Sequence, residues 1–128
     1  MDNRILIREL GQAVARFEEA MEISTDDDLV KAGCIQYFEF SFELAWKTIK
    51  QIANDQGVAD CNSPKSSLKY AFKNSWLDDE EIWLDMLSSR NKMSHTYNAS
   101  TALNVYDKLS SFVEILKNLL ITLEHLDY

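Results

Sequence analysis

The chain has 128 residues, of which 46% are hydrophobic and 11% aromatic, enough to bury a core as one domain spanning residues 1–128. Its net charge of -8 argues against a protein that coats nucleic acid nonspecifically through a broad basic face, while a local basic site is still compatible with it. Three glycines and one proline are too few for a turn-rich β-sandwich or barrel. The composition therefore predicts an all-α protein.

The cysteines and the hydropathy of the sequence indicate the cellular compartment in which we expect the protein. Cys34 and Cys61 have no CxxC spacing and no neighbouring histidine, so we expect neither a disulfide framework nor a metal site. No apolar run approaches the ~20 residues needed to span a bilayer, and the N-terminal segment carries charges where a signal peptide needs an apolar stretch. We expect a cytoplasmic protein with reduced thiols, no cofactor and no contact with a membrane.

Three long segments carry apolar residues at steps of three and four, which is typical of amphipathic helices. They run from about Asn3 to Glu22, from about Leu29 to Asn54, and from about Thr101 to Leu126. The short acidic connection from Ser24 to Asp28 precedes the second segment without the glycine or the distal glutamate of an EF-hand. We therefore expect an aspartate there to cap the helix and not to bind a metal ion.

Ser63 and Pro64 open a short helix, with serine as the N-cap and proline at the first helical position. This helix carries Lys65, Lys69 and Lys73 at steps of four, which places them on one basic edge. Such an edge is usually only solvated. It could bind substrate phosphates if folding brings it close to Arg90.

Asp78 is expected to cap a further helix, which has acidic residues in its first turn. Four main helices with short connections and one extra short helix predict an antiparallel up-and-down four-helix bundle. Trp46, Trp76 and Trp83 are expected in the core or an interface.

The second helix has an apolar arc about 200° wide, about twice that of a helix on a single core. That helix should contact several neighbours, or one core and a partner chain. On its polar face, Glu43 and Lys47 have the i,i+4 spacing that favours an ion pair.

The segment from Ser88 to Tyr106 is rich in hydroxyl and amide groups and contains two cations and no acid. Arg90 could stabilise a phosphate, His95 could exchange protons near neutral pH, and Tyr97 offers a hydroxyl. On an unbroken helix, positions 90 and 95 are about 140° apart. Either the helix ends near Ser94, or the site is assembled across a two-fold interface. The structural alternative is that Arg90 pairs with a surface acid while His95 and Tyr97 satisfy a helix end.

Two sequence blocks carry a family resemblance. FEFSFELAWKTIK, from Phe38 to Lys50, and SPKSSLKYAFKNSWLDDEEIWLDMLSSRNKMSHTY, from Ser63 to Tyr97, closely resemble the nucleotidyltransferase substrate-binding family of the HEPN superfamily, which includes HepT-like toxins. The FELAWK and RNxxSHTY motifs occur in the right order and spacing. One departure is Asn74-Ser75-Trp76, where many relatives carry a turn of small residues.

The resemblance implies a helical bundle that forms a homodimer and works beside a minimal nucleotidyltransferase. Related proteins resemble metal-independent endoribonucleases that use an Arg-x4-6-His motif at the dimer cleft, here Arg90 and His95. In related toxin–antitoxin pairs the nucleotidyltransferase transfers AMP to the tyrosine of Arg-x4-His-x-Tyr, here Tyr97. The added bulk and negative charge would block RNA entry.

Three functions stay open. In the first, the chain is an endoribonuclease in which His95 is the general acid/base, Arg90 stabilises the developing charge, and Asn91 and Ser94 orient the phosphate or the histidine. In the second, the same cleft only binds a nucleotide or presents an acceptor to the nucleotidyltransferase, which the negative net charge favours slightly. In the third, the chain is a dimerisation bundle without a ligand, which leaves the polar segment unexplained. We expect the toxin-like ribonuclease, with the binding subunit as the alternative.

Overall fold

The computed structural model describes residues 3–95 and 98–126, with positions 94 and 95 described as backbone only. It contains five helices in these ranges: α1 (Asn3–Met21), α2 (Asp28–Asp55), α3 (Pro64–Lys73), α4 (Glu80–His95) and α5 (Ala99–Glu124). Within the described residues there is no strand, so the all-α prediction is confirmed.

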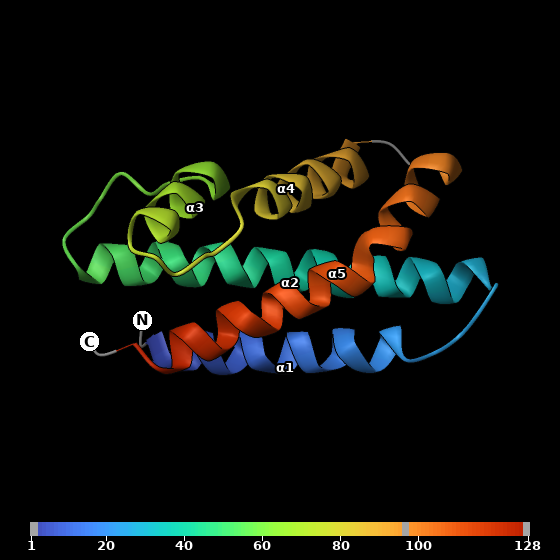
Figure 1. The fold of residues 1–128 in the computed structure, drawn as a ribbon, viewed down its shortest axis with the longest axis horizontal. Coiled ribbons are helices and arrows are strands. Elements are labelled where there is room, and N and C mark those ends of the chain that lie inside the picture. The colour runs from blue at the N-terminus through green and yellow to red at the C-terminus, as the bar shows by residue number, and fades with distance from the viewer. Residues whose placement is uncertain (1–2, 96–97, 127–128) are drawn as a thin grey trace.

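The long helix α2 is the centre of the bundle. Figure 1 shows α1 antiparallel to α2, α5 crossing both obliquely, and the shorter α3 and α4 on the other side of α2. The chain thus runs up and down through α1, α2, α4 and α5, with α3 as the extra short helix. Within the described ranges, no helix is long and apolar enough to cross a membrane.

The core is built around aromatic rings of α2. The Phe38 ring is fully buried and lies 5.2 Å from the ring of Phe112 in α5, with Phe17 of α1 and Phe42 also in contact. Trp83 of α4 packs against Phe42, so the rings join four helices. Each contact removes a large apolar surface from water, which is the main stabilising term of the fold. Five residues of the apolar arc of α2 are fully buried: Phe38, Phe42, Ala45, Ile49 and Ile52. The three tryptophans Trp46, Trp76 and Trp83 are buried as well.

The residues that cap the helix N-termini agree with the predictions from the sequence, except at α4. The side chain of Asp27 accepts a hydrogen bond from the N–H of Leu29, so an aspartate caps α2 as expected. Ser63 caps α3 in a capping box with Ser66. Asp78 was expected to cap α4, but the carboxylate that accepts from the helix, at the N–H of Ile82, belongs to Asp79. The prediction was wrong by one residue because consecutive acids offer equivalent caps.

Two helices end in the same hydrogen-bonding pattern. After α2, Gly57 has φ +86°, and Val58 donates its N–H to the carbonyl of Ala53 at 2.9 Å. After α3, Ser75 has φ +61°, and Trp76 donates to the carbonyl of Ala71 at 2.9 Å. Both are Schellman motifs, which need one residue in the left-handed conformation. The departure at Asn74-Ser75-Trp76 therefore keeps the turn, with serine in a conformation that glycine adopts more easily.

Candidate functional site

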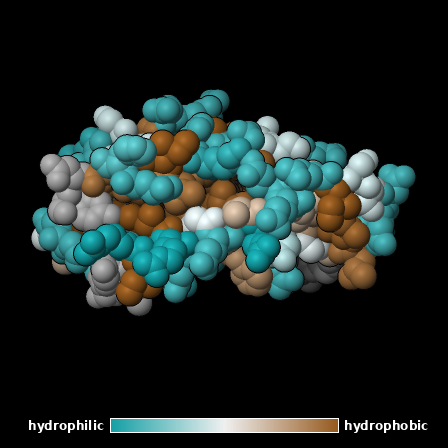
Figure 2. Space-filling view, turned by 90° about the horizontal axis from the view of Figure 1, so that it is seen from below, coloured by the Kyte–Doolittle hydropathy of each residue, from teal (hydrophilic) through white to brown (hydrophobic). Residues whose placement is uncertain are grey.

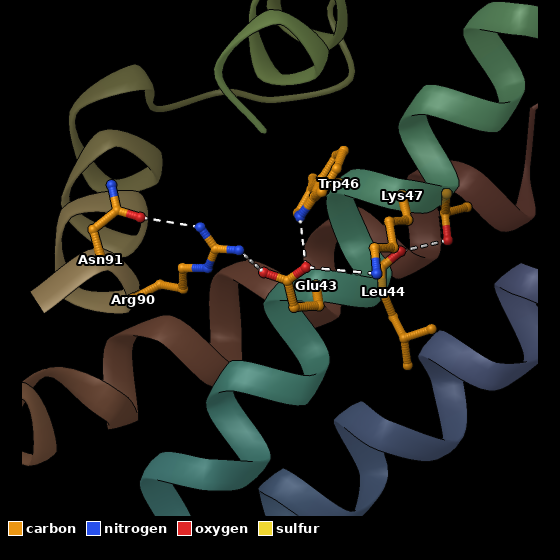
Figure 3. Close-up of polar contacts among 7 residues, drawn as sticks. Glu43, Leu44, Trp46, Lys47, Arg90 and Asn91 are labelled. Carbon is orange, nitrogen blue, oxygen red and sulfur yellow. Dashed lines mark hydrogen bonds and ion pairs between the residues drawn. The ribbon is translucent and has the colours of Figure 1, made fainter. Parts of the chain in front are cut away.

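Arg90 of α4 forms an ion pair with Glu43 of α2 (Figure 3). The other carboxylate oxygen of Glu43 accepts a hydrogen bond from the indole Nε1 of Trp46 at 3.1 Å and lies 3.8 Å from Nζ of Lys47. Arg90 Nη1 also donates to Oδ1 of Asn91 at 3.1 Å. Glu43 of the FELAWK block thus pairs with Arg90 of the RNxxSHTY block, while Trp46 and Lys47 contact the Glu43 carboxylate.

A second carboxylate, Glu39, lies one helical turn before Glu43. Burial raises the pKa of the Glu39 carboxyl, the positive charge of Arg90 lowers it, and the negative charge of Glu43 raises it. The charges of Glu39, Glu43 and Arg90 therefore influence one another in a partly buried part of the surface. The side chains of Arg90 and Glu43 are each 28% exposed, so a phosphate in solution can reach the guanidinium. Arginine binds phosphate oxygens through a planar fork of N–H donors.

The remaining predicted site residues are distributed along α4 and α3. Asn91 is exposed beside Arg90, while the backbone places Ser94 and His95 in the last turn of α4. Of the two arrangements considered, α4 is therefore continuous across positions 90 and 95 within the described residues. Tyr97 lies outside the described residues.

The predicted basic edge of α3 is exposed at Lys65, Lys69 and Lys73. In Figure 1, α3 covers the end of α2 that leads into the α2–α3 connection, and the C-terminal half of α4 extends away from α3. The helix that carries the lysines thus lies beside the start of α4, whereas Arg90 belongs to the C-terminal half of α4. This arrangement supports the solvated-edge interpretation of the lysines.

A cavity of about 440 Å³ opens between the first half of α2, the last turns of α4 and the start of α5. Its apolar wall includes Ile35, Met93 and Tyr106, and Glu39 forms part of its polar wall. Neither this cavity nor the role of Glu43 was predicted from the sequence, which assigned Glu43 only to an ion pair with Lys47. The signal available in the sequence was the spacing of two acids on one face of α2, because Glu39 and Glu43 are four residues apart.

A shallower groove of about 500 Å³ lies between α1 and α2 and includes Glu43. Its apolar residues Tyr37 and Phe40 are 37% and 52% exposed. Figure 2 shows a face of the bundle on which hydrophobic patches alternate with hydrophilic side chains. The groove therefore offers an apolar surface directly beside the residue that holds Arg90.

The cysteines are both buried and free, as expected from their spacing. Burial raises the pKa of the Cys34 and Cys61 thiols, which keeps them protonated near neutral pH. Within the part of the chain that the structure describes, no three His, Cys, Asp or Glu side chains are grouped as a metal site would require.

Comparison with known proteins assigns the chain to a family. Residues 6–125 match the family model described as nucleotidyltransferase substrate binding protein like. The chain belongs to this family. Over 97 residues it is 33% identical to a protein of Haemophilus influenzae named probable ribonuclease HepT, a match that covers 73% of the chain and 66% of the relative.

Two solved structures share the family's fold. A Thermus thermophilus protein matches with a TM-score of 0.82 and 24% identity, covering 91% of this chain and 99% of its own. A Haemophilus influenzae protein matches with a TM-score of 0.70 and 25% identity, covering 97% of this chain and 100% of its own. The second is described as revealing the fold of a substrate-binding domain of a nucleotidyltransferase. The family resemblance inferred from the two sequence blocks is thereby confirmed.

Proposed function

We propose that the chain is the HEPN-type partner of a minimal nucleotidyltransferase in a toxin–antitoxin-like pair, and that it is a metal-independent endoribonuclease of the cytoplasm. The similarity to a protein named probable ribonuclease HepT supports the activity, and the family description supports the partner. The observation that carries the proposal is the arginine of the Arg-x4-His motif, held at the surface by Glu43. A guanidinium fixed in this way can stabilise the charge that develops on a phosphate.

In the proposed reaction, His95 accepts the proton of an RNA 2′-hydroxyl. The 2′-oxygen attacks the adjacent phosphorus, the 5′-oxygen of the next nucleotide leaves with a proton from the protonated His95 imidazole, and a 2′,3′-cyclic phosphate forms. Arg90 stabilises the extra negative charge on the phosphoryl oxygens, and Asn91 and Ser94 orient the phosphate or the histidine.

Regulation follows from the same motif. The nucleotidyltransferase transfers AMP to the hydroxyl of Tyr97, which forms a bond to the α-phosphorus of ATP while pyrophosphate leaves. Because Tyr97 is two residues from His95, the added phosphate would place bulk and negative charge beside the site and repel RNA.

A homodimer would complete the site. On a continuous helix, positions 90 and 95 are about 140° apart around the axis, and α4 is continuous across both. We therefore propose that Arg90 of one subunit works with His95 of the other. The groove that contains Phe40 and Glu43 offers an apolar surface for the second copy next to Arg90.

Two observations favour a second function. The net charge of -8 disfavours long RNA outside a small basic site, and a cavity of about 440 Å³ is within the usual size of small-molecule sites. In this alternative the chain is a non-catalytic nucleotide-binding subunit that presents a substrate to the nucleotidyltransferase.

The two functions are separated by bacterial growth while the chain is induced alone, beside His95→Ala at matched soluble levels. If the chain is a ribonuclease toxin, the wild-type protein arrests growth and the His95→Ala variant does not. Normal growth with both proteins contradicts the toxin. In that case, binding of a nucleotide by the complex with the nucleotidyltransferase, measured by calorimetry and weakened by Arg90→Ala, supports the binding subunit.

A further inference from the structure

The cavity between α2, α4 and α5 is left unused by the proposed reaction. It continues from the Arg90 site, because Glu39 lies one turn before Glu43 on α2 and Met93 lies one turn after Arg90 on α4. One helical turn advances about 5.4 Å. A nucleotide whose phosphate contacts Arg90 would therefore have its sugar and base at the mouth of the cavity.

The cavity wall excludes some ligands by charge. Two carboxylates, Asp28 and Glu39, form part of it, and its cation is Lys31, whose Nζ lies 5.2 Å from the centre of the Tyr106 ring. A phosphate inside the cavity would be opposed by both carboxylates. An uncharged group with N–H donors is favoured instead, because carboxylates only accept hydrogen bonds.

The apolar part of the cavity wall favours a flat ring as the ligand. The ring of Tyr106 and the side chains of Ile35, Met93 and Leu103 surround the space. Proteins commonly hold unpaired bases by stacking them against aromatic and apolar side chains and by hydrogen-bonding their Watson–Crick edge. This wall has side chains able to make both kinds of contact, Tyr106 for stacking and Glu39 for hydrogen bonding.

We infer that the cavity binds the nucleobase next to the phosphate held by Arg90, with Glu39 accepting hydrogen bonds from the base edge. This inference rests on the proposed nucleotide or RNA substrate. Guanine is the best match among the four bases, because its N1–H and its amino group present two adjacent donors to one carboxylate. Uracil is the poorest match, since its single N–H lies between two carbonyl acceptors.

Calorimetry on the full chain tests the inference with guanosine 5′-monophosphate, uridine 5′-monophosphate and ribose 5-phosphate as probes. We expect guanosine 5′-monophosphate to bind about tenfold more tightly than the uridine nucleotide and ribose 5-phosphate to bind weakest. Glu39→Gln should abolish most of this preference. Equal binding of all three probes overturns the inference.

Ala32→Phe provides a variant that fills the cavity from its rim, where Ala32 is exposed, so the core is not disturbed. It should weaken guanosine 5′-monophosphate binding by about tenfold or more. Ala15→Phe is the matched control, because Ala15 is exposed on α1 and does not line the cavity. Unchanged binding in Ala32→Phe, with circular dichroism showing a folded protein, also overturns the inference.

Cleavage of a single-stranded RNA separates this inference from the proposed ribonuclease. Wild-type cleavage without any base preference, unchanged in Ala32→Phe, contradicts the base site and leaves the ribonuclease standing. Base-dependent binding that Ala32→Phe removes, without cleavage by the wild type, supports the base site and contradicts the ribonuclease. If the wild type neither cleaves RNA nor binds the nucleotides, both the base site and the ribonuclease are contradicted.

Discussion

Arg90 in α4 is paired with Glu43 in α2, and the pair joins the two sequence blocks that carry the family resemblance. Trp46 and Lys47, from the same block as Glu43, complete the contacts of its carboxylate. The FELAWK block is therefore more than the core-facing part of a helix. Its Glu43 pairs with the arginine that the proposed reaction needs.

The first prediction concerns Glu43 as a positioning residue. Glu43→Gln should lower the kcat of RNA cleavage by about tenfold or more, because a misplaced catalytic group loses the advantage of orientation. The KM should change less, since the arginine charge is still present. Glu43→Asp should restore part of the activity, which a purely structural role would not explain.

Glu81→Gln is the matched control for that experiment, because Glu81 is exposed on α4. It should leave kcat and KM unchanged. Wild-type kcat in Glu43→Gln would contradict the positioning role.

A second prediction concerns self-association. Phe40 is 52% exposed in the groove beside Glu43, whereas Leu29 is 80% exposed at the start of α2 and does not line the groove. Phe40→Ser should shift the proposed dimer towards monomer at micromolar concentration, as measured by sedimentation, because it removes an apolar contact at the proposed interface. Leu29→Ser should leave the association unchanged. A dimer of equal stability in Phe40→Ser would refute this interface.

The pH dependence of stability provides a third prediction. Burial is the main cause that raises the pKa of Glu39 above its ordinary value of 4.5, with Arg90 opposing it and Glu43 adding to it. The folded protein therefore binds this proton more tightly than the unfolded chain does, and this contribution to stability falls as pH rises from 4.5 through the folded-state pKa. Glu39→Gln lacks it.

The measurement is the difference in Tm between Glu39→Gln and wild type at pH 4 and at pH 7. The difference should be more favourable to the variant at pH 7, by on the order of 1–2 °C. A difference that favours the variant more at pH 4 would mean that the attraction to Arg90 outweighs burial.

Backbone conformation supplies a fourth prediction. Ser75 has φ +61° at the end of α3, where glycine would avoid the steric cost of a Cβ atom. Ser75→Gly should stabilise the fold by about 0.5–1 kcal/mol, in spite of the added freedom of the unfolded chain. Gly57→Ser, at φ +86° in the equivalent turn after α2, should destabilise it. Denaturant unfolding of both variants decides, and a loss of stability in Ser75→Gly would contradict the account of this turn.

Much of the fold follows from local patterns in the sequence. The periodic apolar residues of α2 are buried as predicted because helical spacing places them on one side, and Ser63-Pro64 begins α3 because both residues suit the first turn of a helix. The choice of Asp79 over Asp78 as the cap of α4 depends on where the first turn closes, which neighbouring acids do not reveal.

The site was predictable only in part. Arg90 stood out because its segment has cations and no acid, so the acid that pairs with it had to come from elsewhere in the fold. Glu43 is 47 positions earlier in the sequence, and its i,i+4 spacing to Lys47 offered a sufficient local explanation for its charge. The cavity could not be predicted, because Ile35, Met93 and Tyr106 meet only through the packing of three helices.

Cleavage of single-stranded RNA by the purified chain in the presence of a chelator tests the central claim most directly. Wild type should cleave and leave a 2′,3′-cyclic phosphate, and His95→Ala and Arg90→Ala should lose at least about a hundredfold in rate. Equal cleavage by wild type and His95→Ala, or no cleavage by the wild type, would contradict the assignment of a ribonuclease centre to this chain.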